Sequence, residues 1–407
     1  MEGEKILLRA LSIPIEGNAP PVLRFLLEDF RLAVNNTIRA GIQAKVTSRL
    51  SLQRLMYRQL REAHPGMYAG HLMSVFEIAG AILRNYRREL RKGKSTSIPY
   101  VRRLMMKTDS QRYKIDRTAG TVDLPIRAGL HVNLRLVMSN FSRKYLNDDT
   151  YKCASLNIFP DHVVIVVKKE SPRTITPMTA ISLDTNENSL DGIFTTDESS
   201  IGMRVQFPQV ARIQECHHER RKHLQAKKKH DQRLSRDLCK REGRREHNRI
   251  SYRLHEVANS VVKFAEREQS AIVIEDLKGL KSKKSKEMNR RLNMWPRREL
   301  HRILEYKAEE YGIPVIKVNP YNSSRTCPIC GKVNKSRMGA KFECKCGWQL
   351  DRQINAGINL LQTASSKGLA GGLRFDPGAF QHDTVIDLCA NGVSRESNGM
   401  SGNLVST

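Results

Sequence analysis

The chain has 407 residues, enough for two or three domains that each bury a core of their own. Its 70 Lys and Arg exceed its 42 Asp and Glu and give a formal net charge of +28, so a polyanion is the expected partner, with nucleic acid ahead of an anionic membrane. We find neither a signal peptide nor an apolar run of about 18 residues. The sequence therefore favours a soluble, intracellular protein with no membrane partner.

The first half of the chain is predicted to combine a strand, a helical bundle and a small sheet. Residues 6–15 read as a strand, and residues 20–91 carry apolar side chains at helical spacing, as at Leu23, Leu27 and Phe30. Between residues 100 and 167 short alternating runs are separated by Asp, Asn, Gly and Pro, which is typical of an antiparallel sheet or barrel. The first strand could pair into this sheet, which would make the helical bundle an insertion.

The second half follows a different order, with three strands, then helix, strand, helix, strand and helix. Between Ala211 and Glu256 the chain has 15 Lys and Arg against 7 Asp and Glu, no Pro and one Gly, so this segment should be helical. The other predicted elements are strands near 181–184, 189–194, 203–207, 272–275 and 313–318 and helices near 295–311 and 352–361. This order predicts an RNase H-like α/β domain. The last forty residues, rich in Gly, Ser and Asn, predict a tail with little regular structure.

Three carboxylates stand where these elements end or begin. Asp184 and Glu275 each end an apolar strand, and Asp351 starts the last helix. Acids that converge in this way can bind two Mg²⁺ ions, which activate water and stabilise the leaving oxygen in phosphodiester cleavage. Each acid alone could instead cap a turn or a helix. Because all three occur in this order, we favour the metal site.

Four cysteines form a compact motif, which we call the knuckle, before the last helix. The spacing of Cys327-Pro-Ile-Cys330 and Cys344-Lys-Cys346 fits a tetrahedral, structural Zn²⁺, and Gly331 and Gly347 supply the permissive backbone that such turns need. The other cysteines are scattered, which indicates a reducing compartment without a disulfide framework: Cys153, Cys216, Cys239 and Cys389. We interpret the sequence Cys216-His-His218 as side chains of the charged helix, not as a second metal site.

The charged helical segment is either a solvated face or a surface that contacts phosphates. Its excess of Lys and Arg, interspersed with Gln and Asn, favours contact with an RNA or RNA–DNA duplex. A second basic segment, residues 278–286, follows Glu275 and could guide a strand toward the acids.

In combination these motifs resemble the TnpB proteins of insertion sequences, compact relatives of type V CRISPR effectors. The resemblance rests on Ile181-Ser-Leu-Asp184, Ile272-Val-Ile-Glu275, the cysteine motif and the segment 351–359, Asp-Arg-Gln-Ile-Asn-Ala-Gly-Ile-Asn. It implies an RNA-guided endonuclease that binds a guide RNA from the transposon end and cuts double-stranded DNA next to a short target-adjacent motif. It also implies a prokaryotic, nucleoid-associated protein that acts as a monomer or as a dimer on one RNA.

The resemblance further implies an α/β RNase H-like (RuvC) nuclease domain with an inserted zinc ribbon, and an N-terminal β-rich wedge domain that carries a helical recognition bundle. The expected boundaries are 1–18 and 96–175 for the wedge domain, 19–95 for the recognition domain, 176–325 and 350–365 for the nuclease domain, 326–349 for the zinc ribbon and 366–407 for the tail.

Asp184 matches the first and Glu275 the second catalytic acid of this family. The third acid usually stands two residues before the first Asn of the last motif, where this chain has Gln353. A neutral amide cannot supply the charge that two Mg²⁺ ions require, so we expect Asp351 to substitute for it. The main alternative is a nuclease-inactive, RNA-guided DNA-binding repressor. A third possibility is a transposase that acts on transposon ends without RNA.

Overall fold

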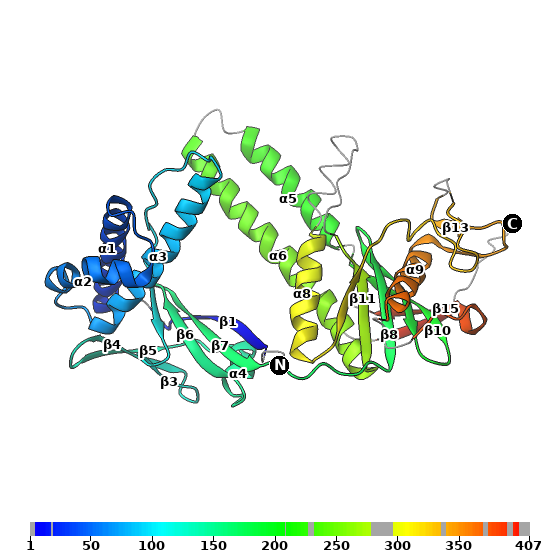
Figure 1. Ribbon diagram of the computed structural model, residues 1–407, viewed down its shortest axis with the longest axis horizontal. Coiled ribbons are helices and arrows are strands. Elements are labelled where there is room, and N and C mark those ends of the chain that lie inside the picture. The colour runs from blue at the N-terminus through cyan, green and yellow to red at the C-terminus, as the bar shows by residue number, and fades with distance from the viewer. Residues whose placement is uncertain are drawn as a thin grey trace. The chain divides into compact units, whose positions relative to one another are not determined.

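The protein is described from a computed structural model that covers residues 5–17, 19–207, 209–226, 232–277, 296–334, 339–368, 373–388 and 394–398. It divides into two compact units, Met1–Glu170 and Ser171–Thr407 (Figure 1). Each unit has its own hydrophobic core. The basic segment 278–286, which we expected to guide a nucleic-acid strand, lies outside the described residues.

Three helices form the first part of the N-terminal unit and confirm the predicted bundle: α1 (Pro21–Gln43), α2 (Arg49–Ala63) and α3 (Ala69–Arg91). α1 begins with Pro21, whose missing N–H costs nothing at a helix start. α2 begins after Ser48, whose hydroxyl accepts a hydrogen bond from the backbone N–H of Ser51. Leu23, Leu27 and Phe30 lie on one face of α1 and are fully buried, as their spacing predicts.

The same unit contains two antiparallel sheets. β1 (Ile6–Pro14), β7 (His162–Glu170), β6 (Lys152–Ile158) and β2 (Met106–Asp109) pair in that order. β1 pairs with β7, so the expected pairing of the first strand is confirmed. The remaining elements are β3 (Lys114–Asp116), β4 (Thr121–Arg127) and β5 (Leu130–Arg135), which form the second sheet, and α4 (Asn140–Leu146).

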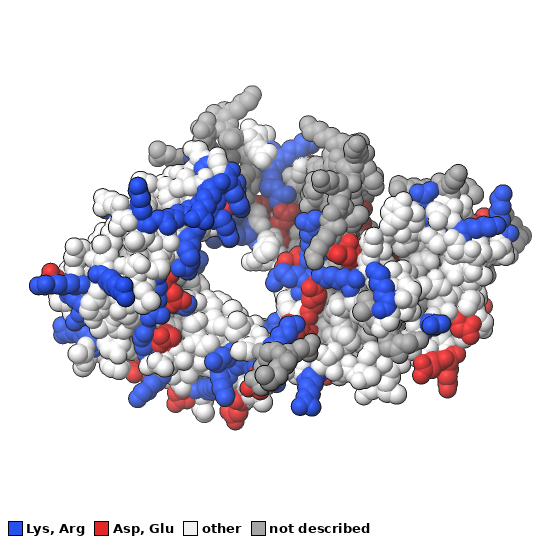
Figure 2. All heavy atoms as spheres, in the orientation of Figure 1, with Lys and Arg blue, Asp and Glu red and all other residues white. Residues whose placement is uncertain are grey.

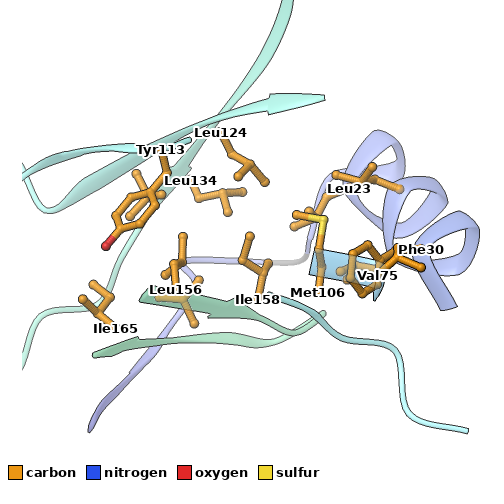
Figure 3. Packing of buried hydrophobic residues seen from close by; sticks show 14 of the residues in the cluster. Leu23, Phe30, Val75, Met106, Tyr113, Leu124, Leu134, Leu156, Ile158 and Ile165 are labelled. Carbon is orange, nitrogen blue, oxygen red and sulfur yellow. The ribbon is translucent and has the colours of Figure 1, made fainter. Parts of the chain in front are cut away.

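One continuous core joins the bundle to both sheets. Met106 of β2 lies between Phe30 and Val75 of the helices and Ile158 of the neighbouring strand (Figure 3). Leu124 of the second sheet packs into the same cluster. Bundle and sheets therefore share their buried apolar surface and belong to one unit.

A seven-stranded mixed sheet forms the centre of the C-terminal unit. Its spatial order is β12 (Val315–Val318), β11 (Ser270–Glu275), β8 (Thr179–Thr185), β9 (Ser189–Thr195), β10 (Ser200–Gln206), β15 (Phe380–Leu388) and β16 (Ser394–Asn398). β8 to β10 form the predicted antiparallel meander, and β11 and β12 run parallel to β8.

Helices cover both faces of this sheet (Figure 1). α9 (Arg352–Ser366) packs on one face against Ala180, Ile193 and Val273. On the other face, α6 (Gln232–Arg267) and α8 (Arg297–Glu310) cover Ile181, Leu183 and Ile272, and α5 (Gln209–Ala226) packs on α6. The predicted order of strands and helices is confirmed, and the charged segment is helical.

The expectation of a largely unstructured tail is wrong for residues 394–398, which form β16, and for residues 380–388. Residues 380–388 form β15, which runs parallel to β10 and extends the sheet. Phe380 packs against α9, whereas Ile386 and Leu388 join the core on the opposite face. The averaged polar composition of the last forty residues concealed this short strand, because three buried apolar side chains, Phe380, Ile386 and Leu388, are enough to anchor its two faces.

Candidate active site

The ends of β8 and β11 place two acids side by side. In the parallel pairing of these strands Leu183 lies opposite Ile274, so Asp184 and Glu275 follow at the same edge of the sheet. Both side chains project to the face covered by α9, because Ala180 and Val273, at even spacing from them, contact that helix. The structure thus brings together two of the three predicted acids.

The same line continues across the sheet. Asp191 of β9 lies opposite Asp184, Arg204 of β10 lies opposite Asp191, and Asp387 of β15 lies opposite Arg204. We refer to these residues as the ionisable row: Glu275, Asp184, Asp191, Arg204 and Asp387. Four carboxylates and one guanidinium therefore meet on one face of a largely apolar sheet.

Burial and mutual repulsion keep the first two acids from ionising together. Burial, followed by the charges of Glu275 and Asp191, raises the pKa of Asp184 to about 8, although Arg352 and Arg297 oppose the rise. Burial also raises the pKa of Glu275. Oε1 of Glu275 is buried and has no hydrogen-bond partner within the described part of the chain. A divalent cation would neutralise both acids and give this oxygen a partner, so the pair fits an oxygen-ligated metal.

Asp191 is stabilised in a different way. It is completely buried, but it forms an ion pair with Arg204 and accepts hydrogen bonds from Ser189 and from Asn186 Nδ2, the latter at 3.0 Å. The guanidinium and two neutral donors compensate its charge. Asp191 is therefore already neutralised by the protein.

Asp351, the expected third acid, lies next to Arg204. Its Oδ1 caps α9 by accepting from the backbone N–H groups of Gln353, at 2.8 Å, and Ile354, at 3.3 Å. Its Oδ2 lies 3.6 Å from Nη2 of Arg204. Among the described residues, only the four cysteines of the knuckle form a group of three or more possible metal ligands, so Asp351 does not meet Asp184 and Glu275 at ligand distance.

Gln353 faces a pocket of about 200 Å³ that Asp184 and Asn186 also line. Residues of the knuckle and of the segment just before it also line this pocket, among them Arg325 and Lys341. The residue at the family's usual third-acid position thus lies beside the first acid, with a neutral amide in place of a carboxylate.

The four cysteine sulfurs converge as the spacing predicted. All four Sγ atoms lie within 4.8 Å of one another, and the closest pairs, Cys327 with Cys346 and Cys330 with Cys344, are both 3.5 Å apart. Tetrahedral Zn–S bonds of about 2.3 Å place sulfurs about 3.8 Å apart, so the quartet fits a zinc ion. Gly331 and Gly347 have φ values of 70° and 92°, which glycine adopts without strain.

Two buried asparagines tie this knuckle to α9. Asn355 donates to the carbonyl of Thr326 at 3.0 Å and accepts from the indole N–H of Trp348 at 3.2 Å. Asn359 donates to the carbonyls of Ser323 and Thr326, both at 2.8 Å. The two Asn side chains therefore fix the start of α9, and with it Asp351 and Gln353, against the knuckle; β13 (Lys341–Glu343) and β14 (Gln349–Asp351) complete this contact.

Close packing of α9 on the sheet requires glycine at position 357. A Cβ atom there would lie 2.5 Å from Cα of Gly192, which is shorter than real contacts allow. The hydroxyl of Ser182 donates to the carbonyl of Gly357 at 2.7 Å. The helix is thereby held against the strands that carry the acids.

The chain is similar in sequence to several known proteins. The sequence profile described as "Cas12f1-like, TNB domain" matches residues 298–360, and that of the "Uncharacterized protein MJ0013 family" matches residues 26–122. The TnpB-like protein MJ0751 of Methanocaldococcus jannaschii is 28% identical over 247 residues, which are 58% of this chain and 88% of that protein. The chain is therefore a relative of the TnpB-like proteins.

Relatives that match over shorter stretches include CRISPR effectors. A CRISPR-associated endodeoxyribonuclease Cas12f1 of an uncultured archaeon is 32% identical over 107 residues, which are 24% of this chain but only 20% of that protein. A solved Cas12f1–sgRNA–target DNA complex contains a chain with the same fold: its TM-score is 0.61 at 13% identity, and the match covers 87% of this chain and 98% of that one.

Basic side chains are abundant on the surface of both units, as the composition predicted (Figure 2). In the C-terminal unit, α6 exposes a run of arginines: Arg236, Arg241, Arg244, Arg245 and Arg249. In the N-terminal unit, the end of α3 and the residues after it expose a second group: Arg84, Arg88, Arg91, Lys92 and Lys94. Within the described residues, no helix has the length and apolar character needed to cross a membrane.

Sequence reasoning missed Asp191, Arg204 and Asp387. Each interrupts a strand whose neighbouring residues are apolar, as in Met203-Arg204-Val205. A charged residue at an inward position of a buried strand is rare unless it is paired, and that was the available signal.

Proposed function

We propose that this chain is an RNA-guided, metal-dependent DNA endonuclease encoded by an insertion sequence. The proposal rests mainly on one observation: the half-buried Asp184 and the buried Glu275 lie at adjoining strand ends with raised pKa values, and Oε1 of Glu275 has no hydrogen-bond donor among the described residues. Two acids that repel each other at a largely desolvated site have no structural advantage for a protein that only binds nucleic acid. The endodeoxyribonuclease name of the Cas12f1 relative agrees with a cutting function.

In this proposal Asp184 and Glu275 hold Mg²⁺ in a RuvC-like domain. Bound there, Mg²⁺ would supply activation of water and stabilisation of the leaving oxygen. Arg325, Arg352 and Lys341 line the same pocket and would hold the phosphates of a DNA strand next to the acids. Asp351 would serve as the third acid only after its Oδ2 leaves Arg204.

The four-cysteine knuckle would bind Zn²⁺ as a structural ion and fix the start of α9. The N-terminal unit would supply the wedge domain, residues 1–18 and 96–175, and the recognition domain, residues 19–95. The exposed arginines of α6 would contact the guide RNA or its duplex with target DNA, by analogy with the solved complex of Cas12f1 with sgRNA and target DNA. Cutting next to a target-adjacent motif belongs to the same proposal.

A second function, RNA-guided repression without cutting, is favoured by Gln353. This amide occupies the pocket beside Asp184, where a third carboxylate would complete the charge needed by two metal ions. A protein with this site could still bind guide RNA and target DNA.

Cleavage of a guide-matched plasmid library separates the two functions. The full chain is coexpressed with the RNA of its transposon end, and cutting is measured with and without Mg²⁺ for the wild type, Asp184→Asn and Asp351→Ala. Mg²⁺-dependent cutting that Asp184→Asn abolishes establishes the endonuclease, and loss in Asp351→Ala would assign the third acid. Tight binding of the matched target without cutting, in all three proteins, would establish the repressor.

A further inference from the structure

Two buried polar residues next to the acid pair, Thr185 and His301, are neither metal ligands nor phosphate contacts in the proposed function. Thr185 follows Asp184 in β8, and its Oγ1 lies 2.8 Å from Nε2 of His301 in α8. Their exposed fractions are 6% and 3%, so water does not compete for this contact. Thr185 belongs to the strand that carries the first acid, whereas His301 belongs to the helix layer on the far face of the sheet.

Thr185 also contacts the second acid. Its hydroxyl and its backbone N–H both donate toward the Glu275 carboxylate, which limits the rise in the pKa of Glu275 that burial causes. Oε1 of the same carboxylate is buried and accepts no hydrogen bond from the described residues. One side of the carboxylate is thus held by donors, and Oε1 is left for a different partner.

The hydroxyl of Thr185 has one proton, so it can donate to only one of its two partners, Glu275 or His301. Burial, helped by the nearby charges of Lys317 and Arg297, lowers the pKa of His301 to about 4, so the imidazole is neutral. A neutral imidazole with its proton on Nε2 donates to Oγ1 of Thr185, and the hydroxyl proton is then free to point at Glu275. The reverse tautomer would turn that proton away from Glu275 and toward His301.

We propose that His301 and Thr185 are positioning residues that form a chain of donors, from Nε2–H to Oγ1 and from the hydroxyl to Glu275, and thereby present Oε1 to the metal ion. This inference rests on the proposed function, since it needs a metal at Asp184 and Glu275. Outer partners of this kind fix the orientation of metal-binding side chains, and their loss typically weakens metal affinity by about 10- to 100-fold.

Metal binding by the full, zinc-loaded chain tests the inference without relying on cleavage. Mn²⁺ is titrated and followed by calorimetry and by its electron paramagnetic resonance signal. Thr185→Val keeps the shape but removes the hydroxyl, and we expect it to weaken Mn²⁺ binding about 10-fold. Thr185→Ser restores the hydroxyl and should bind as the wild type does. His301→Leu, which removes the first donor, should weaken binding, whereas His301→Gln, which retains an N–H donor, should weaken it less.

The outcomes separate this inference from the metal site itself. If Glu275→Gln abolishes Mn²⁺ binding while Thr185→Val and His301→Leu bind Mn²⁺ as tightly as the wild type, the acid pair binds metal and the donor chain is wrong. If Glu275→Gln leaves the Mn²⁺ titration of the wild type unchanged, the metal site is wrong and the inference fails with it. Should Thr185→Val not fold, as judged by its thermal transition, the comparison of His301→Leu with His301→Gln decides.

Discussion

The two parts of the ionisable row differ in how the charges of their carboxylates are compensated. At one end Arg204 and neutral donors neutralise Asp191, and Asp351 also lies next to the guanidinium. At the other end Asp184 and Glu275 follow adjacent strands; burial raises the pKa of both, and the charge of Glu275 adds to the rise for Asp184. We call the Asp191–Arg204 ion pair the finished end of the row. We call Asp184 and Glu275, which form no ion pair with each other because both are acids, the unfinished end.

This difference in charge compensation indicates that an added cation would be stabilised at Asp184 and Glu275 and not at Asp191. A buried acid with its own cation contributes to a stable structure, whereas two neighbouring, largely desolvated acids without an ion pair make the empty site less stable until a cation binds. We expected Asp351 to join Asp184 and Glu275, but it lies next to Arg204. Gln353, in contrast, lines the same pocket as Asp184. Breaking either end should therefore have separate effects on activity and on stability.

The largest expected effect comes from removing a charge at the unfinished end. Asp184→Asn and Glu275→Gln should each reduce Mg²⁺-dependent cleavage of guide-matched DNA by more than about 100-fold, because direct ligands should matter at least as much as the residues that orient them. Rates are measured in single-turnover assays with saturating guide RNA. Asp197→Asn, an exposed residue of the same unit, serves as the control and should cut normally. Unchanged rates in both acid variants would contradict the site.

The finished end should respond in stability. Arg204→Gln leaves the fully buried Asp191 without its cation and should lower the free energy of unfolding by about 3 kcal/mol, measured by urea denaturation. Combining it with Asp191→Asn should restore part of the loss, since the uncompensated charge is then gone. Arg212→Gln, on an exposed position of α5, is the matched control. A neutral effect of Arg204→Gln would mean that water or another cation replaces the guanidinium.

A third change adds a charge to the unfinished end. Gln353→Asp places a carboxylate in the pocket with Asp184 and should raise the cleavage rate about 10-fold, equivalent to about 1.4 kcal/mol of barrier, or create cleavage where the wild type has none. Gln349→Asp, at an exposed position in β14, adds the same charge outside the pocket and should not change the rate. If Gln353→Asp lowers cleavage, Asp351 already supplies the third acid in the active complex.

Much of this arrangement could be predicted from local sequence. Apolar runs that end in an acid located Asp184 and Glu275, and cysteine spacing located the knuckle, because each signal lies within a few residues. The pairing of Asp351 with Arg204 could not be predicted in this way. It depends on the register of β9 and β10 and on the Asn355 and Asn359 hydrogen bonds that set the start of α9, which are contacts between distant parts of the chain.

A pH dependence of stability also distinguishes the two ends. In the unfolded chain an aspartic acid loses its proton near pH 4, whereas folding raises the pKa of Asp184 to about 8. Between these values the folded state binds more protons than the unfolded state, so the free energy of unfolding should fall as pH rises, by at most about 1.4 kcal/mol per pH unit. The stabilisation is complete below about pH 4 and is lost as pH rises through about 8.

Urea midpoints measured between pH 5 and pH 8 in divalent-free buffer check this slope for the zinc-loaded protein. Asp184→Asn should flatten it, because the amide does not titrate. Added Mg²⁺ should also flatten it and raise the stability at pH 8, since the cation replaces the proton that the pair shares. Asp191→Asn removes one of the charges that raise the pKa of Asp184, but burial and the charge of Glu275 remain, so this variant should flatten the slope only in part. Equal slopes for the wild type and Asp184→Asn would show that the acid pair does not hold its proton as its burial requires.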